Sequence, residues 1–373
     1  LDALEGRWLF NTGLGRWSLK GQGWVACQSC HIDGLTDNVT WFFPRGVRQS
    51  PSLDGVFNKK DGSDLRIGNW TAFQDEVSDL EMGALRLIAG GIGAIVKDEK
   101  LAPESRIDLV GAKQAGLAGS SAKAADPKGP GVAGAQCTND DWAKVTTFVR
   151  SIRSPRRPSN LTPELVAQGK ALFDEASCQG CHGGDKWTIS KVFYTPDMTN
   201  TVNAALNARS WNGAVTSAGF PTSLLPATTK QNMRGAPGAV AGNFDQLTCI
   251  LRNVGTFGVA EPAVGVAELR ADMKTAAQGN EEEGRGYNPP SLLAGVIGAP
   301  YLHAGQVRTL EGLFAGTFGK HHQAFAADFL SDTDPARAAK VEALVQFLLS
   351  IDGDAEAMAI PQLGPKGGDF CAP

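Results

Sequence analysis

The segment Ser177-Cys178-Gln179-Gly180-Cys181-His182 contains two cysteines that are separated by two residues and followed directly by a histidine. The same pattern occurs once more, in Cys27-Gln28-Ser29-Cys30-His31. Cys-x-x-Cys-His is the attachment sequence of c-type haem, because the spacing lets each thiol add to one haem vinyl group. The adjoining imidazole becomes the proximal iron ligand. The sequence therefore predicts two covalently bound haems c, held at Cys27, Cys30 and His31 and at Cys178, Cys181 and His182.

Each motif by itself is also compatible with a zinc site or a redox-active dithiol, since both use closely spaced thiolates. Neither motif has a second Cys-x-x-Cys that would complete a tetrahedral zinc site, and the duplication argues against both alternatives. Haem is attached to bacterial chains outside the cytoplasmic membrane. We therefore expect an exported protein of the periplasm or cell exterior, with any signal peptide removed before Leu1.

The composition excludes some partner classes and indicates much irregular backbone. With 35 Lys and Arg against 39 Asp and Glu, the 373-residue chain has a formal net charge of −4, which disfavours nucleic acid as a partner. No run of about 18 or more apolar residues occurs, so no transmembrane segment is expected. The 45 Gly and 20 Pro predict long loops, among them 111–134 and 200–242.

An internal repeat divides the chain into two helical parts. Gly6-Arg7-Trp8-Leu9-Phe10 precedes the first motif and Gly169-Lys170-Ala171-Leu172-Phe173 precedes the second, and both are typical of the helix that leads into a haem motif. The second of these helices should start at Thr162-Pro163. Matching helices are expected at 143–152 and 339–351, and the proline-rich stretch 153–160 resembles a linker. We predict a mainly α fold of two cytochrome c-like haem domains with long loops, residues 1–155 and 156–373.

Further motifs carry a family resemblance. Arg48-Gln49-Ser50-Pro51-Ser52-Leu53 is similar to an Arg-Asn-x-Pro-x-Leu element, and the segments 288–292, 299–305 and 309–311 are similar to a later element that contains Pro-Tyr-Phe-His-Asp-Gly and Thr-Leu-Glu. In this order the motifs resemble the bacterial di-haem cytochrome c peroxidases and their relative MauG, which matures a tryptophylquinone enzyme. The resemblance implies that the N-terminal haem meets hydrogen peroxide or oxygen, while a six-coordinate C-terminal haem relays electrons.

The second axial ligand of the C-terminal haem must differ from that of the family. The family uses a Met or Tyr at a position that is Thr317 here, and His303 occupies a motif position that is structural in the family. His321 and His322 follow Thr317 closely, so one of them is expected to ligate this iron, with two solvent-facing histidines as the alternative. The remaining candidate ligands are the methionines, namely Met82, Met198, Met233, Met273 and Met358.

The N-terminal iron lacks a nearby second histidine. Apart from His182, which is already assigned, no histidine lies between His31 and His303. The family's removable distal histidine aligns with Trp41. Unless Met82 ligates it, we expect this iron to be five-coordinate, in a pocket shaped by Trp41 or its two neighbours, Phe42 and Phe43. An open ferric haem binds peroxide, oxygen or small anions, so this haem is the predicted reaction centre.

Peroxide cleavage needs a base that moves the proton from the near oxygen to the leaving one. The resemblance places this base at Glu81, within Glu81-Met82-Gly83, with Glu76 as the second choice and a solvated helix face as the alternative for the acidic stretch. It also implies that Trp70 lies between the haems and assists electron transfer, although a packing role is an alternative. Possible calcium ligands are implied at the family's inter-domain positions, here Gln49, Gly298 and Pro300.

Three cysteines lie outside the motifs. In an oxidising compartment Cys249 and Cys371 are the expected disulfide pair, which leaves Cys137 over. The leading hypothesis is a peroxidase or MauG-like oxidoreductase that takes electrons from a small protein such as a cytochrome c or cupredoxin. An electron carrier without peroxidase activity and a haem oxygenase similar to the di-haem rubber-cleaving proteins are the alternatives.

Overall fold

The structure is a computed structural model that describes residues 1–12, 26–43, 46–62, 64–66, 68–70, 138–191, 252, 254–255 and 287–361. Its fold is mainly α, as predicted. The elements are α1 (Asp2–Asn11), α2 (Cys27–Cys30), η3 (Ile32–Gly34), β1 (Thr40–Phe43), β2 (Gly46–Gln49), α3 (Thr138–Ser151), α4 (Pro163–Glu175), α5 (Gln179–His182), η10 (Gly295–Ile297), η11 (Glu311–Phe314), η12 (Gly316–Phe318), α9 (Gly319–His322) and α10 (Arg337–Leu349).

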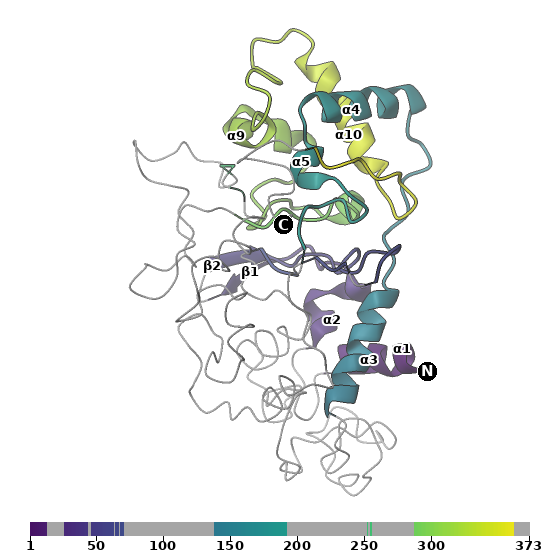
Figure 1. The fold of residues 1–373 in the computed structure, drawn as a ribbon. Coiled ribbons are helices and arrows are strands. Elements are labelled where there is room, and N and C mark those ends of the chain that lie inside the picture. Colours follow the sequence, from purple (N-terminus) through teal and green to yellow (C-terminus); the bar gives the residue numbers. More distant parts are fainter. Residues whose placement is uncertain are drawn as a thin grey trace, which may run out of the picture.

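In the N-terminal half, α1 packs across α3, and the short α2 lies beside them (Figure 1). Leu9 and Phe10 of α1 are buried with Val145 and Phe148 of α3. Gly6 makes the close crossing possible, because a Cβ at this position would lie 1.9 Å from the carbonyl oxygen of Lys144.

The C-terminal half repeats this arrangement with α4 and α10 (Figure 1). Helix α4 begins at Pro163 with Thr162 as its N-cap residue, as the sequence predicts. Gly169 allows the close contact here, since a Cβ would lie 2.0 Å from the carbonyl oxygen of Ala343. The repeated Gly-x-x-x-Phe pattern of the sequence thus has the same packing role in both halves.

Strands β1 and β2 form a two-stranded antiparallel hairpin, and they are the only β-strands in the described part of the chain. The sequence analysis did not foresee it. Its register pairs Trp41 with Arg48 and Thr40 with Gln49. Gln49 at its end donates a backbone hydrogen bond of 2.7 Å to the carbonyl oxygen of His303, so the hairpin contacts the C-terminal half.

Other polar contacts join the two halves along the same seam. Asn288 donates its backbone N–H to the carbonyl oxygen of Trp70 at 2.8 Å and its side-chain amide to that of Asn69 at 3.0 Å. Lys186, which is buried, pairs with Asp64. The C-terminal residues near the second motif are therefore fixed against the N-terminal half. None of the helices described is both long and apolar enough to cross a membrane.

Candidate functional site

Both Cys-x-x-Cys-His motifs form a single helical turn. The backbone N–H of His31 donates to the carbonyl oxygen of Cys27 at 2.9 Å, and that of His182 donates to Cys178 at 3.0 Å. The four motif thiols form no disulfide. Burial raises the pKa of the Cys27 and Cys178 thiols to about 12. Each turn brings its two thiols and its histidine close together, as haem attachment requires.

The two motif histidines are oriented in the same way. Nδ1 of His31 donates to the carbonyl oxygen of Leu35 at 3.2 Å, and Nδ1 of His182 donates to that of Pro290 at 3.1 Å, because a carbonyl can only accept. Each hydrogen bond holds the proton on Nδ1, fixes the ring orientation and leaves the Nε2 lone pair free to bind a metal. Metal-binding histidines usually make such a bond with the ring nitrogen that does not bind the metal. Burial lowers the pKa of both imidazoles, that of His182 to about 4, which keeps them neutral.

A cavity that is partly open to solvent lies beside the second motif and is lined by residues of both halves. Cys178, Cys181 and His182 stand in its wall. Arg66 and Arg252 also line it and are buried, and burial lowers the pKa of both guanidinium groups. Nε of Arg66 has no hydrogen-bond partner. A cavity with two thiols, an oriented imidazole and buried cations fits a haem with its two propionate carboxylates.

His321 faces His182 across this cavity. The ring centroids are 6.2 Å apart, and the ring planes are 81° to each other. His322, the next residue, is buried and instead packs beside Phe314, with ring centroids 6.1 Å apart. The alternative ligand Met358 lies in the C-terminal core and not among the residues that line the cavity, so the structure gives no support to Met358 as the ligand.

Trp70 is in the seam between the halves. Its indole N–H donates to the carbonyl oxygen of Gln49 at 2.8 Å, and its ring meets His303 edge-on at 6.3 Å between centroids. His303 stacks on Tyr287 at 3.8 Å, and its Nε2 lies 3.2 Å from the Gln306 amide nitrogen. Trp70, Tyr287 and His303 all line the cavity. Three contacting rings thus line the cavity that also contains the second motif.

Trp41 is partly buried beside the first motif. Its indole N–H donates to a carboxylate oxygen of Asp37 at 2.6 Å. Asp37 acts electrostatically on the neighbouring motif and favours a higher pKa both for the Cys30 thiol and for His31. Trp41 therefore lies close to the first motif.

Several predicted residues lie outside the part of the chain that can be described. They include the two candidate bases, four methionines, the three remaining cysteines and both long loops. The side chains of Phe42 and Phe43 are also outside it. These residues are Glu76, Glu81, Met82, Met198, Met233, Met273, Cys137, Cys249 and Cys371, with loops 111–134 and 200–242.

The three residues implied for calcium, Gln49, Gly298 and Pro300, line the same cavity. The side-chain oxygen of Gln49 accepts a hydrogen bond of 3.1 Å from the Thr40 hydroxyl. Gln49 Nε2 is buried without a partner. No group of three or more His, Cys, Asp or Glu side chains suited to a metal ion occurs among the described residues, and the calcium site stays a prediction.

Sequence reasoning missed five contributors to these sites: Asp37, Arg66, Arg252, Tyr287 and the carbonyl of Pro290. A buried arginine or a backbone carbonyl has no local pattern that distinguishes it from many others. Asp37 offered a weak signal, since a carboxylate four residues before an indole can accept its N–H.

The helices, the two motif turns and the seam define a mainly α fold. One solved structure with a similar fold is the crystal structure of a MauG-like protein associated with microbial copper homeostasis, with a TM-score of 0.52 and 17% identity over 95% of this chain and 89% of that chain. At this identity the likeness shows the fold alone. No protein-family model matches the chain, and no curated protein matches it.

Proposed function

We propose that this chain is an exported di-haem c-type oxidoreductase that reduces hydrogen peroxide, or activates oxygen, at the N-terminal haem. The observation that carries the proposal is the pair of Cys-x-x-Cys-His turns, each with its histidine Nδ1 bonded to a carbonyl oxygen. The fold, which is similar to that of a MauG-like protein, supports it. Haem supplies an iron that exchanges electrons and that binds small oxidants where one axial position is free.

The protein's own residues would divide the work between the two sites. His182 and the residue that faces it would both hold the C-terminal haem, which would suit this haem to electron relay. No histidine lies between His31 and His182 in the sequence. The N-terminal haem would therefore have no second histidine ligand from its own half, which would leave one coordination position of its iron open. Trp70, in the seam, would aid electron transfer between the two.

The remaining roles follow from this division. A carboxylate, Glu81 or else Glu76, would act as the base that transfers the peroxide proton, and Trp41 would shape the pocket around it. A small electron-donor or acceptor protein, such as a cytochrome c or cupredoxin, is the proposed partner, and the periplasm or cell exterior is the proposed location. A calcium ion near Gln49 would hold the seam.

The test combines spectroscopy of the oxidised protein with turnover. Electron paramagnetic resonance should show one high-spin and one low-spin haem, and hydrogen peroxide should oxidise a reduced small cytochrome in the presence of the protein. The high-spin signal should be lost in His31→Ala, and turnover should fall at least about 100-fold in Glu81→Gln. Two low-spin haems without turnover would instead support the second candidate function, an electron carrier.

A further inference from the structure

Three separate observations concern the atoms around His321, and they bear on how the C-terminal haem is held. The first is a distance. A metal–imidazole bond of about 2.0–2.1 Å on each side, with about 1.1 Å from each nitrogen to its ring centre, places the centroids of two axial imidazoles about 6.3 Å apart. The centroids of His182 and His321 are 6.2 Å apart. The separation therefore leaves room for an iron between the two rings, although edge-to-face rings in direct contact, such as Trp70 and His303 at 6.3 Å, have a similar separation, so the other two observations are needed as well.

The second observation is a buried nitrogen without a partner. Nδ1 of His321 is buried and makes no hydrogen bond, whereas Nδ1 of His182 has the Pro290 carbonyl oxygen. Leaving a buried polar atom unpaired costs about 1–3 kcal/mol, so we expect this nitrogen to gain a partner when the cavity is filled. His321 also lines the cavity that the second motif borders.

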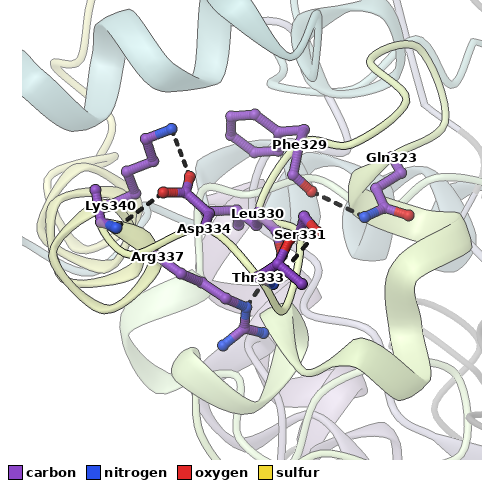
Figure 2. A network of polar contacts seen from close by, with 9 residues as sticks. Gln323, Phe329, Leu330, Ser331, Thr333, Asp334, Arg337 and Lys340 are labelled. Atoms are coloured by element: carbon purple, nitrogen blue, oxygen red, sulfur yellow. Dashed lines mark hydrogen bonds and ion pairs between the residues drawn. The ribbon is translucent and has the colours of Figure 1, made fainter.

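The third observation is the firm support behind α9, which carries His321. Gln323, just after α9, donates its amide to the carbonyl oxygen of Phe329 at 3.0 Å (Figure 2). Arg337 of α10 donates from Nε to the carbonyl oxygen of Leu330 at 3.0 Å and from its terminal nitrogen to that of Phe314.

Asp334, in the loop before α10, pairs with Lys340 of α10 at 2.8 Å (Figure 2). Phe314, Phe329 and Leu330 are core residues. The chain on both sides of His321 is therefore anchored to α10, which argues against the alternative of two solvent-facing histidines on a loop.

His322 differs from His321 in the position of its ring relative to His182. It is buried, and neither ring nitrogen has a hydrogen-bond partner, but its ring lies beside Phe314 and not opposite His182. Adjacent residues of a helical turn point about 100° apart, so only one of the two histidines can face a given point.

We infer that His321, and not His322, is the second axial ligand of the C-terminal haem, opposite His182, with the two imidazole planes close to perpendicular. The inference deepens the proposed function, because it requires the second haem but not peroxide turnover. It makes this haem a bis-histidine site in which both iron faces are closed, so that external oxidants are excluded from it. A second histidine in place of methionine also lowers the reduction potential.

The first experiment uses the unmodified, haem-loaded protein. Perpendicular axial imidazoles give ferric haem a strongly anisotropic low-spin paramagnetic resonance signal, and we expect one such haem per chain. Two outcomes would overturn the inference. One is a methionine–iron charge-transfer band in the far red, and the other is the ordinary rhombic low-spin signal that parallel imidazoles give. This measurement does not depend on whether any variant folds.

The second experiment compares the neighbouring variants His321→Ala and His322→Ala. The first should convert one haem per chain from low spin to high spin and allow carbon monoxide to bind it after reduction, and added imidazole should restore the low-spin signal. The second should keep the low-spin signal. The reverse result, or low-spin haem in both variants, would overturn the inference.

His321→Met covers the case in which His321→Ala does not retain haem. It should keep the haem low spin, show the methionine–iron band and raise the potential of this haem alone. Absence of that band in a variant that keeps its haem would count against His321. If the ligand tests succeed and peroxide is not reduced, the proposed function fails while the ligand assignment stands.

Discussion

The ammonium group of Lys186 is buried against the carboxylate of Asp64, and the pair joins the segment just after the second haem motif to the N-terminal half. The Lys186 side chain is 6% exposed and that of Asp64 is 35% exposed. Asp64 also accepts a hydrogen bond of 2.9 Å from the side-chain amide of Asn58. The two partners therefore differ in what their removal leaves behind.

We expect Asp64→Asn to be more destabilising than Lys186→Met. Asp64→Asn leaves a buried ammonium group without its counter-charge, which costs about 3 kcal/mol. Lys186→Met leaves a carboxylate that water and Asn58 can still reach. Denaturant unfolding of both variants measures the difference, and an equal loss of free energy would show that burial of Lys186 is not the controlling factor.

The same pair predicts a dependence of stability on alkaline pH. Burial lowers the pKa of Lys186 in the folded protein below its ordinary value. The unfolded chain therefore binds this proton more tightly, and the contribution of Lys186 to the free energy of unfolding rises as the pH rises between the folded and unfolded pKa values. Lys186→Met should remove this contribution, which denaturation of both proteins at several alkaline pH values would detect.

The helix-crossing glycines should tolerate no side chain. In Gly6→Ala and Gly169→Ala the added methyl group would lie about 2 Å from a carbonyl oxygen of the facing helix, so the helices must separate. We expect a loss of about 3 kcal/mol in the free energy of unfolding. The exposed neighbours Arg7→Ala and Lys170→Ala are matched controls and should change stability by less than about 0.5 kcal/mol. Thermal unfolding followed by circular dichroism compares the four variants.

Asp37 and Trp41 should tune the potential of the N-terminal haem in opposite directions. A negative charge near an iron stabilises the ferric state, so Asp37→Asn should raise the reduction potential of this haem by tens of millivolts, roughly 1 kcal/mol. Trp41→Phe removes the N–H that partly neutralises Asp37 and should lower the potential. Spectroelectrochemical titration resolves the two haems. The C-terminal haem serves as the internal control and should not shift.

Trp70→Phe should slow electron transfer between the haems and leave their resting spectra unchanged. The substitution keeps an aromatic ring in the seam but removes the indole N–H that bonds to Gln49. Stopped-flow reduction should show at least a tenfold slower second phase. An unchanged rate with an unfolding transition at lower temperature would assign Trp70 to packing instead.

Much of the local structure was predictable because it depends on short-range rules. Thr162-Pro163 marks the start of α4 through the geometry of Pro at the first helical turn. The motif turns follow from the spacing of Cys27 and Cys30 and of Cys178 and Cys181. The hairpin of β1 and β2 was not predicted, since Trp41, Phe42 and Phe43 have no strict alternation and were interpreted through the family resemblance.

The sequence by itself determined the two Cys-x-x-Cys-His motifs, the repeated helix with its crossing glycine and the small set of histidines that could ligate iron. These features are local patterns of residue type and spacing. Only the tertiary structure decided that His321 and not His322 faces His182, that Lys186 pairs with Asp64 and that Arg66 and Arg252 meet in one cavity. The physical reason is that these residues are far apart in sequence, and the packing of α4 on α10 and of the two halves against each other sets which side chains meet.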